Sequence, residues 1–272
     1  MTQVNAIVLR AAGINCDMET EHALELAGAA AQRVHVNRLI ENKGLLNEFQ
    51  IMVIPGGFSY GDDVAAGKIL ANQFVHHFLE PIQDFIDQGK LVLGICNGFQ
   101  VLVKAGLLPG RTSSEQQQEV TITNNDSAKY EDRWAYLAPQ TDRCIFIEPG
   151  RQLYLPVAHG EGKVVTRDNA VLEGLKAEGH VAFKYVDENG REGDFPINPN
   201  GSMGSIAGLT DTTGRILGLM PHPERFVRPT QHPRWTRQEQ ADADGMTIFK
   251  NAVKYVQEHF ASRRLSVSSP CA

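Results

Sequence analysis

Short apolar runs alternate with helical patterns in the first part of this 272-residue chain, and this alternation restricts the fold more than any other feature. Four apolar runs have the length of buried strands: 4–9, 33–36, 51–54 and 91–95. Segments with apolar residues at helical spacing lie between or after them: 18–30, 74–86 and 99–105. Strands that alternate with helices pack as a sheet covered by helices on both faces. We therefore predict an α/β fold with a mostly parallel central sheet flanked by helices.

The second half of the chain has a different pattern. Residues 111–143 are rich in Ser, Gln, Asn and charge, and short strand-like runs separated by turn signals follow them: 144–147, 153–157, 181–185 and 216–219. These runs predict an antiparallel extension that closes the same sheet. An apolar stripe over 246–260 predicts a last helix. We expect one domain over 1–262 and a polar, flexible tail over 263–272.

Charge and hydropathy exclude several classes of protein. The 26 basic and 32 acidic residues give a formal net charge of −6, which disfavours a nucleic-acid binder. No apolar stretch reaches the length of about 18 residues that a membrane span needs, and the first residues do not resemble a signal peptide. The four cysteines stand far apart and form no CxxC pair. We therefore predict a cytoplasmic protein with neither a metal site nor a disulfide framework.

One cysteine stands in a setting typical of a nucleophile. The segment Leu91-Val92-Leu93-Gly94-Ile95-Cys96-Asn97-Gly98 is a strand that enters G-x-C-x-G, and a helical pattern follows. This is the layout of a nucleophile elbow, in which small neighbours permit a strained turn. The sulfur at a helix start gains thiolate character, and the Asn97 N–H can face an oxyanion. A buried structural cysteine is the alternative for Cys96; Cys16, Cys144 and Cys271 lack this setting and are expected to be inert.

Two histidines are candidates for the base that such a thiol needs, because each precedes a carboxylate by two residues. They are His222, before Glu224, and His159, before Glu161. In an extended segment, residues two apart face the same way, so the carboxylate can orient the imidazole. Prolines 221 and 223 favour an extended segment around His222. We therefore prefer His222, while each histidine could also be held by its carboxylate without any catalytic role.

A glycine-rich turn, Pro55-Gly56-Gly57-Phe58-Ser59-Tyr60-Gly61-Asp62, follows the predicted strand at 51–54. Ligands gather at the carboxyl ends of strands in such sheets. Two glycines allow a backbone N–H to approach a small substrate closely, so this turn can supply a second oxyanion donor. A phosphate-binding loop is disfavoured because the P-loop lysine is missing, whereas an ordinary tight turn remains an alternative.

Together these segments resemble the class I, triad-type glutamine amidotransferases, over nearly the whole chain. The resemblance rests on six motifs: GGFSYGDD (56–63), GICNGFQ (94–100), NNDSAKYEDRW (124–134), HGEGK (159–163), NPNGS (198–202) and MPHPER (220–225). The family implies a flavodoxin-like sheet. It also implies Cys96 as nucleophile, His222 as general base and acid, and Glu224 as the partner of His222.

The same resemblance implies the substrate contacts. Backbone N–H groups of Gly57, Phe58 and Asn97 would form the oxyanion hole. The expected glutamine-binding residues are Gly56, Gln100, Gly160 and Glu161. The segment HGEG is thereby assigned to binding and HPE to the triad, in agreement with the preference for His222.

The implied reaction is hydrolysis of L-glutamine through a cysteine thioester. Within the family, the likeness is to subunits that supply ammonia to a separate synthetase of purine biosynthesis. That synthetase subunit is expected to use ATP and Mg²⁺, and a small third subunit to help the complex assemble, so no cofactor is expected in this chain. Two alternatives stay open: a free-standing cysteine amide hydrolase of the same fold, and a non-catalytic scaffold.

Overall fold

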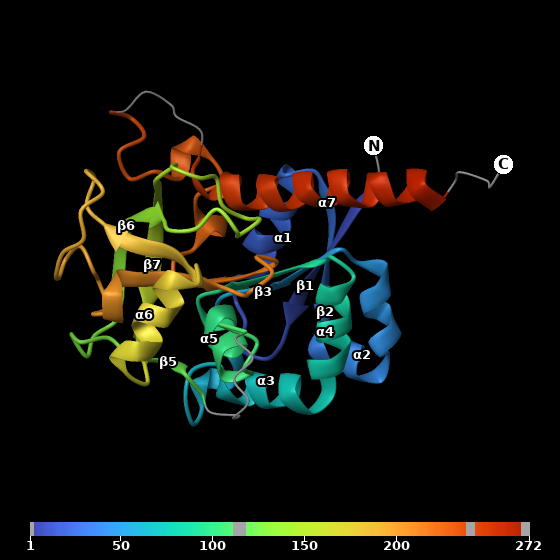
Figure 1. The fold of residues 1–272 in the computed structure, drawn as a ribbon, viewed down its shortest axis with the longest axis horizontal. Coiled ribbons are helices and arrows are strands. Elements are labelled where there is room, and N and C mark those ends of the chain that lie inside the picture. Colours follow the sequence, from blue (N-terminus) through green and yellow to red (C-terminus); the bar gives the residue numbers. More distant parts are fainter. Residues whose placement is uncertain (1–2, 111–117, 238–242, 268–272) are drawn as a thin grey trace.

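The computed structural model describes residues 3–110, 118–237 and 243–267. It contains one central sheet of nine strands in the order β2-β1-β3-β4-β11-β10-β9-β6-β7. Helices cover this sheet. Residues 120–186 lie toward the end of the sheet formed by β6 and β7, whereas the C-terminal helix, residues 245–267, runs back over the parallel part (Figure 1). The predicted α/β fold with its flanking helices is therefore confirmed.

The first five strands of that order are parallel. They are β2 (Ala29–His35), β1 (Val4–Arg10), β3 (Ile51–Ile54), β4 (Leu91–Ile95) and β11 (Ile216–Leu219). Every residue of β3, β4 and β11 is buried, as expected for strands covered on both faces. Since the strands are parallel, their carboxyl ends share one edge of the sheet, where ligands usually bind.

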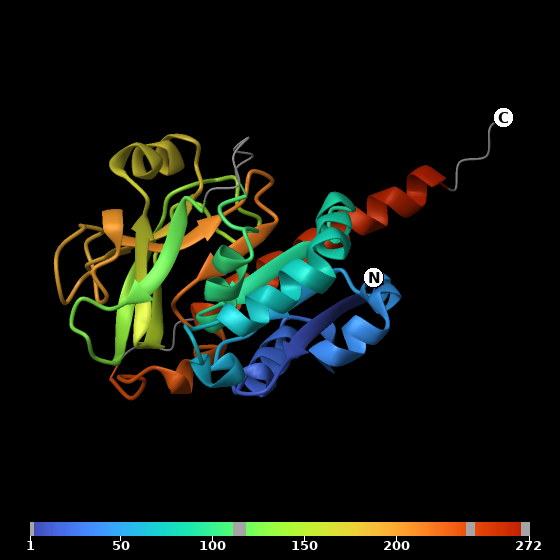
Figure 2. The ribbon, with the colours of Figure 1, turned by 90° about the horizontal axis from the view of Figure 1, so that it is seen from below.

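The other four strands form an antiparallel extension, as predicted, but the run 216–219 that was expected in it is β11, which pairs parallel with β4. They are β10 (Ile206–Thr210), β9 (Val181–Val186), β6 (Glu131–Pro139) and β7 (Leu153–His159). Two further strands, β5 (Val120–Asn124) and β8 (Glu161–Thr166), pair antiparallel in a small second sheet. Figure 2 shows this region beside the parallel part of the molecule.

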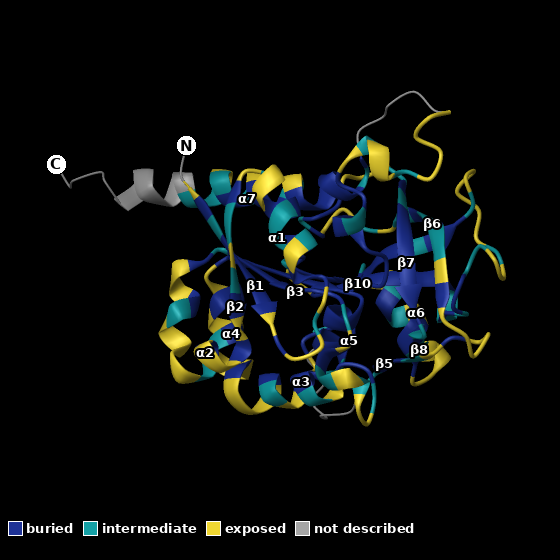
Figure 3. Cartoon of the chain, turned by 180° about the vertical axis from the view of Figure 1, so that it is seen from behind, coloured by how far each residue is buried: buried dark blue, intermediate teal, exposed yellow. Residues whose placement is uncertain are grey.

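Seven α-helices accompany the strands among the described residues: α1 (Asp17–Leu26), α2 (Val36–Glu41), α3 (Lys68–Gln73), α4 (Leu79–Asp87), α5 (Asn97–Lys104), α6 (Asn169–Ala177) and α7 (Gly245–Val267). Helices α1 and α7 lie on one side of the parallel strands, and α3, α4 and α5 on the other (Figure 1). Burial follows this layering, since the strands are buried and the outer helix faces are exposed (Figure 3). None of the described helices is long and apolar enough to cross a membrane.

Several element boundaries differ from the sequence-based predictions. Helix α1 ends at Leu26 instead of running to residue 30, because Gly28 adopts a left-handed conformation (φ 97°) and β2 begins at Ala29. The helix predicted over 74–86 begins earlier, at Lys68, and contains a π-helical turn over Phe74–Phe78. Helix α7 continues to Val267, past the predicted start of the flexible tail; residues 268–272 lie outside the described part.

Two larger discrepancies lie in the middle of the chain. Residues 144–147 form a turn instead of the predicted strand, although Cys144 and Phe146 are buried. Their apolar character therefore reflects packing of a loop into the core. Conversely, the polar segment 111–143 contains β5 and β6, of which β6 packs only every second side chain inward. A half-buried strand carries many polar residues, so composition alone did not reveal it.

Candidate active site

Cys96 occupies a strained turn between β4 and α5. Its backbone has φ 50° and ψ −103°, a conformation that a non-glycine residue rarely adopts. The two elbow glycines are required because their surroundings leave no room for a side chain. A Cβ on Gly98 would collide with the Ile54 carbonyl oxygen, and a Cβ on Gly94 would lie 2.7 Å from the Gly98 carbonyl oxygen. The neighbouring strand and the helix start therefore leave no room for larger residues. The thiol is 6% exposed, at the carboxyl edge of the parallel strands.

His222 and Glu224 form a buried pair beside this thiol. The Nδ1 atom of His222 lies 2.6 Å from Oε1 of Glu224, and both residues are 1% exposed. His222 is held in place by its backbone N–H, which donates to the Pro156 carbonyl at 2.8 Å. The local conformation differs from the expectation, because His222 is extended but Pro223–Arg225 forms a 3-10 turn with proline at its start. This turn, and not a continuous extended segment, brings the carboxylate to the ring.

The surroundings of His222 favour its charged form. Burial alone lowers the pKa of His222, but the Glu224 carboxylate and the sulfurs of Cys96 and Cys16 outweigh that effect and raise it well above the ordinary value of 6.5. Nε2 of His222 is buried and makes no hydrogen bond to another described residue. The ring can therefore hold a proton on the side away from Glu224, as an imidazolium beside a thiolate requires.

Two backbone N–H groups are placed to meet an oxyanion. Asn97 is the first residue of α5, so its N–H has no partner within the helix. Gly57 has φ 140°, which only glycine adopts readily, and its N–H makes no hydrogen bond to another described residue. By contrast, the N–H of Phe58 already donates to the Gly13 carbonyl at 2.9 Å. The glycine turn thus offers Gly57 as a donor, whereas the predicted donor Phe58 is occupied.

The predicted glutamine-binding residues lie together next to the elbow. Nε2 of Gln100 donates to the carbonyl of Glu161 at 2.6 Å, and Oε1 of Gln100 accepts from Asn97 Nδ2 at 3.0 Å. The Asn97 amide also donates to Asp62 at 3.1 Å. This network joins the elbow, the glycine turn and the 160–161 segment. Gly56 instead packs against His222, since a Cβ there would lie 2.7 Å from Cε1 of the ring.

Asparagine and serine side chains hold the HGEG segment in shape. Oδ1 of Asn125 accepts from the Gly162 N–H at 3.0 Å and lies 3.1 Å from Nδ1 of His159. Nδ2 of Asn200 donates to the Gly162 carbonyl at 2.8 Å, and the Ser202 hydroxyl accepts from the Val164 N–H at 3.0 Å. The motifs NNDS and NPNGS therefore support the strand turn that carries Gly160 and Glu161.

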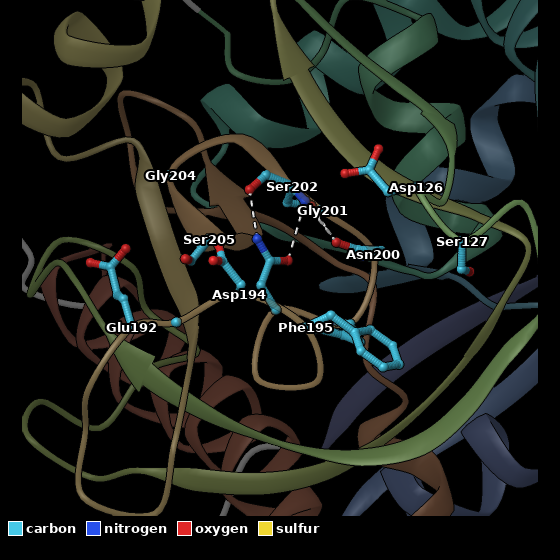
Figure 4. Close-up of a pocket in the computed structure, with 13 residues that line it drawn as sticks. Asp126, Ser127, Glu192, Asp194, Phe195, Asn200, Gly201, Ser202, Gly204 and Ser205 are labelled. Carbon is cyan, nitrogen blue, oxygen red and sulfur yellow. Dashed lines mark hydrogen bonds between the residues drawn. The ribbon is translucent and has the colours of Figure 1, made fainter.

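The NPNGS motif also lines a cavity of about 810 Å³. At its wall (Figure 4), Oδ1 of Asn200 accepts from the Ser202 backbone N–H at 3.0 Å and from the Ser202 hydroxyl at 2.7 Å. The side chain of Asn198 accepts from the Ser202 N–H at 3.2 Å, so these groups are engaged in holding the loop. None of Cys96, His222 and Glu224 is among the residues that line it. The cavity is thus separate from the candidate active site.

His159 does not pair with Glu161 as the alternative assignment required. Its Nδ1 bonds to Asn125, and a Cβ on Gly162 would collide with the ring. Burial first, and the nearby charge of His222 second, lower the pKa of His159 to about 4. His159 is therefore neutral near pH 7. It supports the HGEG turn, and it lies outside the Cys96–His222–Glu224 group.

Sequence reasoning missed Cys16, which had been expected to be inert. Its thiol is 1% exposed and lies beside His222 and Glu224; the ligand atoms of the three residues all fall within 4.8 Å of one another. Such donors can bind a soft metal, but a metal here would compete with the His222–Glu224 hydrogen bond. A signal for Cys16 existed in the chain: like Cys96 and Gly56, it follows a predicted parallel strand and so belongs to the same sheet edge.

The fold and this site, with an elbow cysteine beside a buried histidine–glutamate pair, define a class I glutamine amidotransferase. Residues 3–256 match the family of CobB/CobQ-like glutamine amidotransferase domains. The chain belongs to that family and, within it, to the PurQ subunits of phosphoribosylformylglycinamidine synthase.

Named relatives cover almost the whole chain. The PurQ subunit of Dehalococcoides mccartyi is 46% identical, with 95% of this chain and 100% of the relative aligned. That of Methanococcus maripaludis is 38% identical over 92% of this chain and 96% of the relative. A chain in the solved structure of PurLQS from Thermotoga maritima is 29% identical, with a TM-score of 0.70 over 94% of this chain and 100% of that one.

Selective labelling should identify the active thiol. A γ-haloketone analogue of glutamine should alkylate Cys96 near neutral pH and spare Cys16 and Cys144. Burial raises the pKa of Cys144 to about 12, and burial also raises that of Cys16, so both remain neutral thiols. Peptide mapping by mass spectrometry after labelling of the native protein measures this. Labelling of Cys16 or Cys144 with Cys96 unmodified would exclude Cys96 as the nucleophile. Cys271 lies outside the described residues.

His159 should make the protein less stable in acid. Because its folded pKa of about 4 lies below its ordinary value of 6.5, the unfolded chain takes up the proton first as the pH falls. The neutral His159 ring makes its full contribution to the free energy of unfolding above about pH 6.5, and this contribution decreases as the pH falls toward 4. Between pH 7 and pH 5 the free energy of unfolding should fall by about 2 kcal/mol more in the wild type than in His159→Gln. Urea unfolding at both pH values tests this; equal declines would contradict it.

Proposed function

We propose that this chain is the glutaminase subunit of a phosphoribosylformylglycinamidine synthase. It hydrolyses glutamine through a cysteine thioester and supplies the ammonia to an ATP-dependent synthetase subunit in de novo purine biosynthesis. The observation that carries the proposal is the buried His222–Glu224 pair, with a 2.6 Å contact, beside a cysteine on a turn with φ 50°. A scaffold without catalysis would have no need for this strain or for a buried charge pair.

The first half of the reaction forms the thioester. Cys96, as the thiolate, attacks the side-chain amide carbon of glutamine, and the carbonyl electrons move to oxygen. The N–H groups of Gly57 and Asn97 hold the resulting oxyanion. His222 gives its proton to the leaving nitrogen, so ammonia departs and the carbonyl re-forms as a glutamyl thioester. Glu224 holds the ring throughout through Nδ1.

The second half releases glutamate. His222, now neutral, takes a proton from a water molecule as that water attacks the thioester carbon. The second oxyanion collapses and expels the Cys96 thiolate, which again lies beside an imidazolium. Gln100 and the Gly160–Glu161 backbone are assigned to the amino acid end of the substrate. Their position next to the elbow, joined by the 2.6 Å bond from Gln100 to Glu161, supports this assignment.

The remaining parts of the proposal concern the assembly. A synthetase subunit would bind ATP and Mg²⁺ and use the ammonia to convert formylglycinamide ribonucleotide to the amidine. A small third subunit would help the complex assemble, and the whole would act in the cytoplasm. The likeness to a chain of the Thermotoga maritima PurLQS structure supports a partnership with other subunits.

A paired assay tests the proposed function. Amidine formation is measured with glutamine or with ammonium as the nitrogen donor, with and without the synthetase and ATP. We expect glutamine-dependent synthesis only when both subunits are present, and faster glutamine hydrolysis in the complex than in the isolated chain. A fast glutaminase that is indifferent to the synthetase would instead establish a free-standing hydrolase. A chain that binds the synthetase but hydrolyses no glutamine would establish a scaffold.

A further inference from the structure

Cys16 lies beside the His222 ring, in a segment that also bonds to the glycine turn after β3. It stands between β1 and α1, where its carbonyl accepts from the Thr20 hydroxyl at 2.6 Å. Its sulfur is buried and contacts the His222 ring on the side of Gly56; a Cβ on Gly56 would touch both, at 3.3 Å from the sulfur and 2.7 Å from Cε1. Cys16 and Gly56 together therefore form the wall against which the imidazole packs.

The Cys16 sulfur is itself held by two polar partners. Nη2 of Arg225 donates to it at 3.2 Å, and the thiol donates to Oδ1 of Asn15 at 3.3 Å. Nε of Arg225 also lies 4.0 Å from Oε1 of Glu224. The guanidinium thus connects the sulfur on one side of the imidazole with the carboxylate that holds Nδ1. A thiol that only filled space in the core would have no such charged donor.

The segment that ends at Cys16 also fixes the oxyanion turn. The Gly13 carbonyl accepts from the Phe58 N–H at 2.9 Å, and the Cys16 N–H donates to the Gly56 carbonyl at 3.3 Å. Ile14 pairs with Gly57 in an isolated antiparallel bridge. Residues 13–16 thereby hold the backbone donor of Gly57 in a fixed place relative to the imidazole. Residues 13–16 therefore position both the backbone donor of Gly57 and the imidazole of His222.

We propose that Cys16 is a positioning residue for the triad. Its sulfur, fixed by Arg225, holds the imidazole of His222 in the orientation that lets Nδ1 meet Glu224 while Nε2 faces Cys96. The inference rests on the proposed glutaminase reaction. A single hydrogen bond to Glu224 leaves the ring free to tilt, whereas a second contact beside Nδ1 removes that freedom. Misplacement of a general base by a fraction of an ångström lowers the rate of proton transfer without changing substrate binding.

Cys16 also acts on the charge of the ring. The contact with its sulfur is one of the interactions that raise the pKa of His222. The titratable side chains that act on this imidazole come from several elements: Glu224 in the 3-10 turn, Cys16, Cys96, His159 and Tyr130. The Arg225 guanidinium acts on Cys16 and Glu224. Without Cys16 the imidazolium form of His222 is less favoured, so the Cys96 sulfur loses part of the charge partner that its reaction requires.

Two readouts on Cys16→Ala test the proposal. In the complex with the synthetase, kcat for glutamine hydrolysis should fall roughly ten- to hundredfold with KM within about twofold of wild type. In the isolated chain, the pH at which Cys96 alkylation reaches half its plateau should move upward. Cys16→Ser, which keeps a hydrogen-bonding side chain, should recover most of the loss. Cys144→Ala removes another buried thiol, away from the site, and should leave both readouts within about twofold of wild type.

A second variant removes the other partner of the contact between Arg225 and the Cys16 sulfur. Arg225→Met removes the donor to Cys16 from a partly exposed position, so it keeps the proposal testable if Cys16→Ala does not fold. It should lower kcat in the same direction, with KM little changed. Wild-type kcat and an unshifted alkylation profile in Cys16→Ala, or a loss confined to KM, would overturn the positioning role. Equal losses in Cys144→Ala would do the same. If the wild-type complex itself hydrolysed no glutamine, the proposed function would fail, while the alkylation profile would still decide the role of Cys16.

Discussion

A complex that carries Cys96→Ser should make no amidine from glutamine while still making it from ammonium salts. Serine keeps the shape of the elbow, but its hydroxyl is a far weaker nucleophile than a thiolate at neutral pH. Glutamine-dependent synthesis should fall by about a thousandfold or more. Ammonium at high concentration bypasses this subunit, so ammonia-dependent synthesis should stay within about twofold of wild type. The measurement is amidine formation with each donor, at equal concentrations of assembled complex.

The control is assembly itself, followed by size-exclusion chromatography of both complexes. If the assembled Cys96→Ser complex loses synthesis from both donors, this subunit does more than deliver ammonia. Should glutamine-dependent synthesis persist, the nucleophile is another residue. Cys144→Ser provides a matched substitution at a buried thiol outside the site, and it should keep both activities.

Replacing His222 with alanine should abolish turnover at saturating glutamine, because the thiol loses the group that accepts and returns its proton. We expect a fall in kcat of about a thousandfold or more. His159→Ala is the comparison, since this histidine is equally buried but bonds to Asn125 and supports the HGEG turn. Its removal should raise KM for glutamine by disturbing the Gly160–Glu161 backbone, with a much smaller effect on kcat. Steady-state hydrolysis over a range of glutamine concentrations separates the two effects.

An equal collapse of kcat in both variants would leave the triad unassigned, because loss of either buried ring would then act through the whole site. Thermal unfolding of each variant shows whether the folded state survives. A kcat loss in His222→Ala alone, with both proteins folded, would establish the functional difference between two histidines that stand in similar sequence contexts.

Much of the site could be predicted from the sequence because it is built from local segments. The elbow is one strand, one turn and one helix start, and its glycines are required by contacts at Gly94 and Gly98 that the G-x-C-x-G spacing already indicates. The His222–Glu224 pair needs only two residues of separation and a proline-rich turn. The pairing was predicted correctly, but its geometry was not: Pro223–Arg225 forms a 3-10 turn, and this turn brings the carboxylate to the ring.

The sequence by itself therefore determined the α/β class, the buried parallel strands at 4–9, 51–54 and 91–95, the elbow and the identity of the paired histidine, but it assigned the parallel strand β11 to the antiparallel extension. Only the tertiary structure decided which segments meet. Cys16 and Arg225 are 209 positions apart, and Asn125 reaches His159 and Gly162 from the turn that follows β5. The reason is physical. The local pattern of apolar and polar residues determines how a single segment folds, whereas the strand order β1-β3-β4-β11 determines which strands have neighbouring carboxyl ends. That order places the Cys16 thiol, expected to be inert, beside the His222 ring, and it leaves the Phe58 N–H bonded to the Gly13 carbonyl.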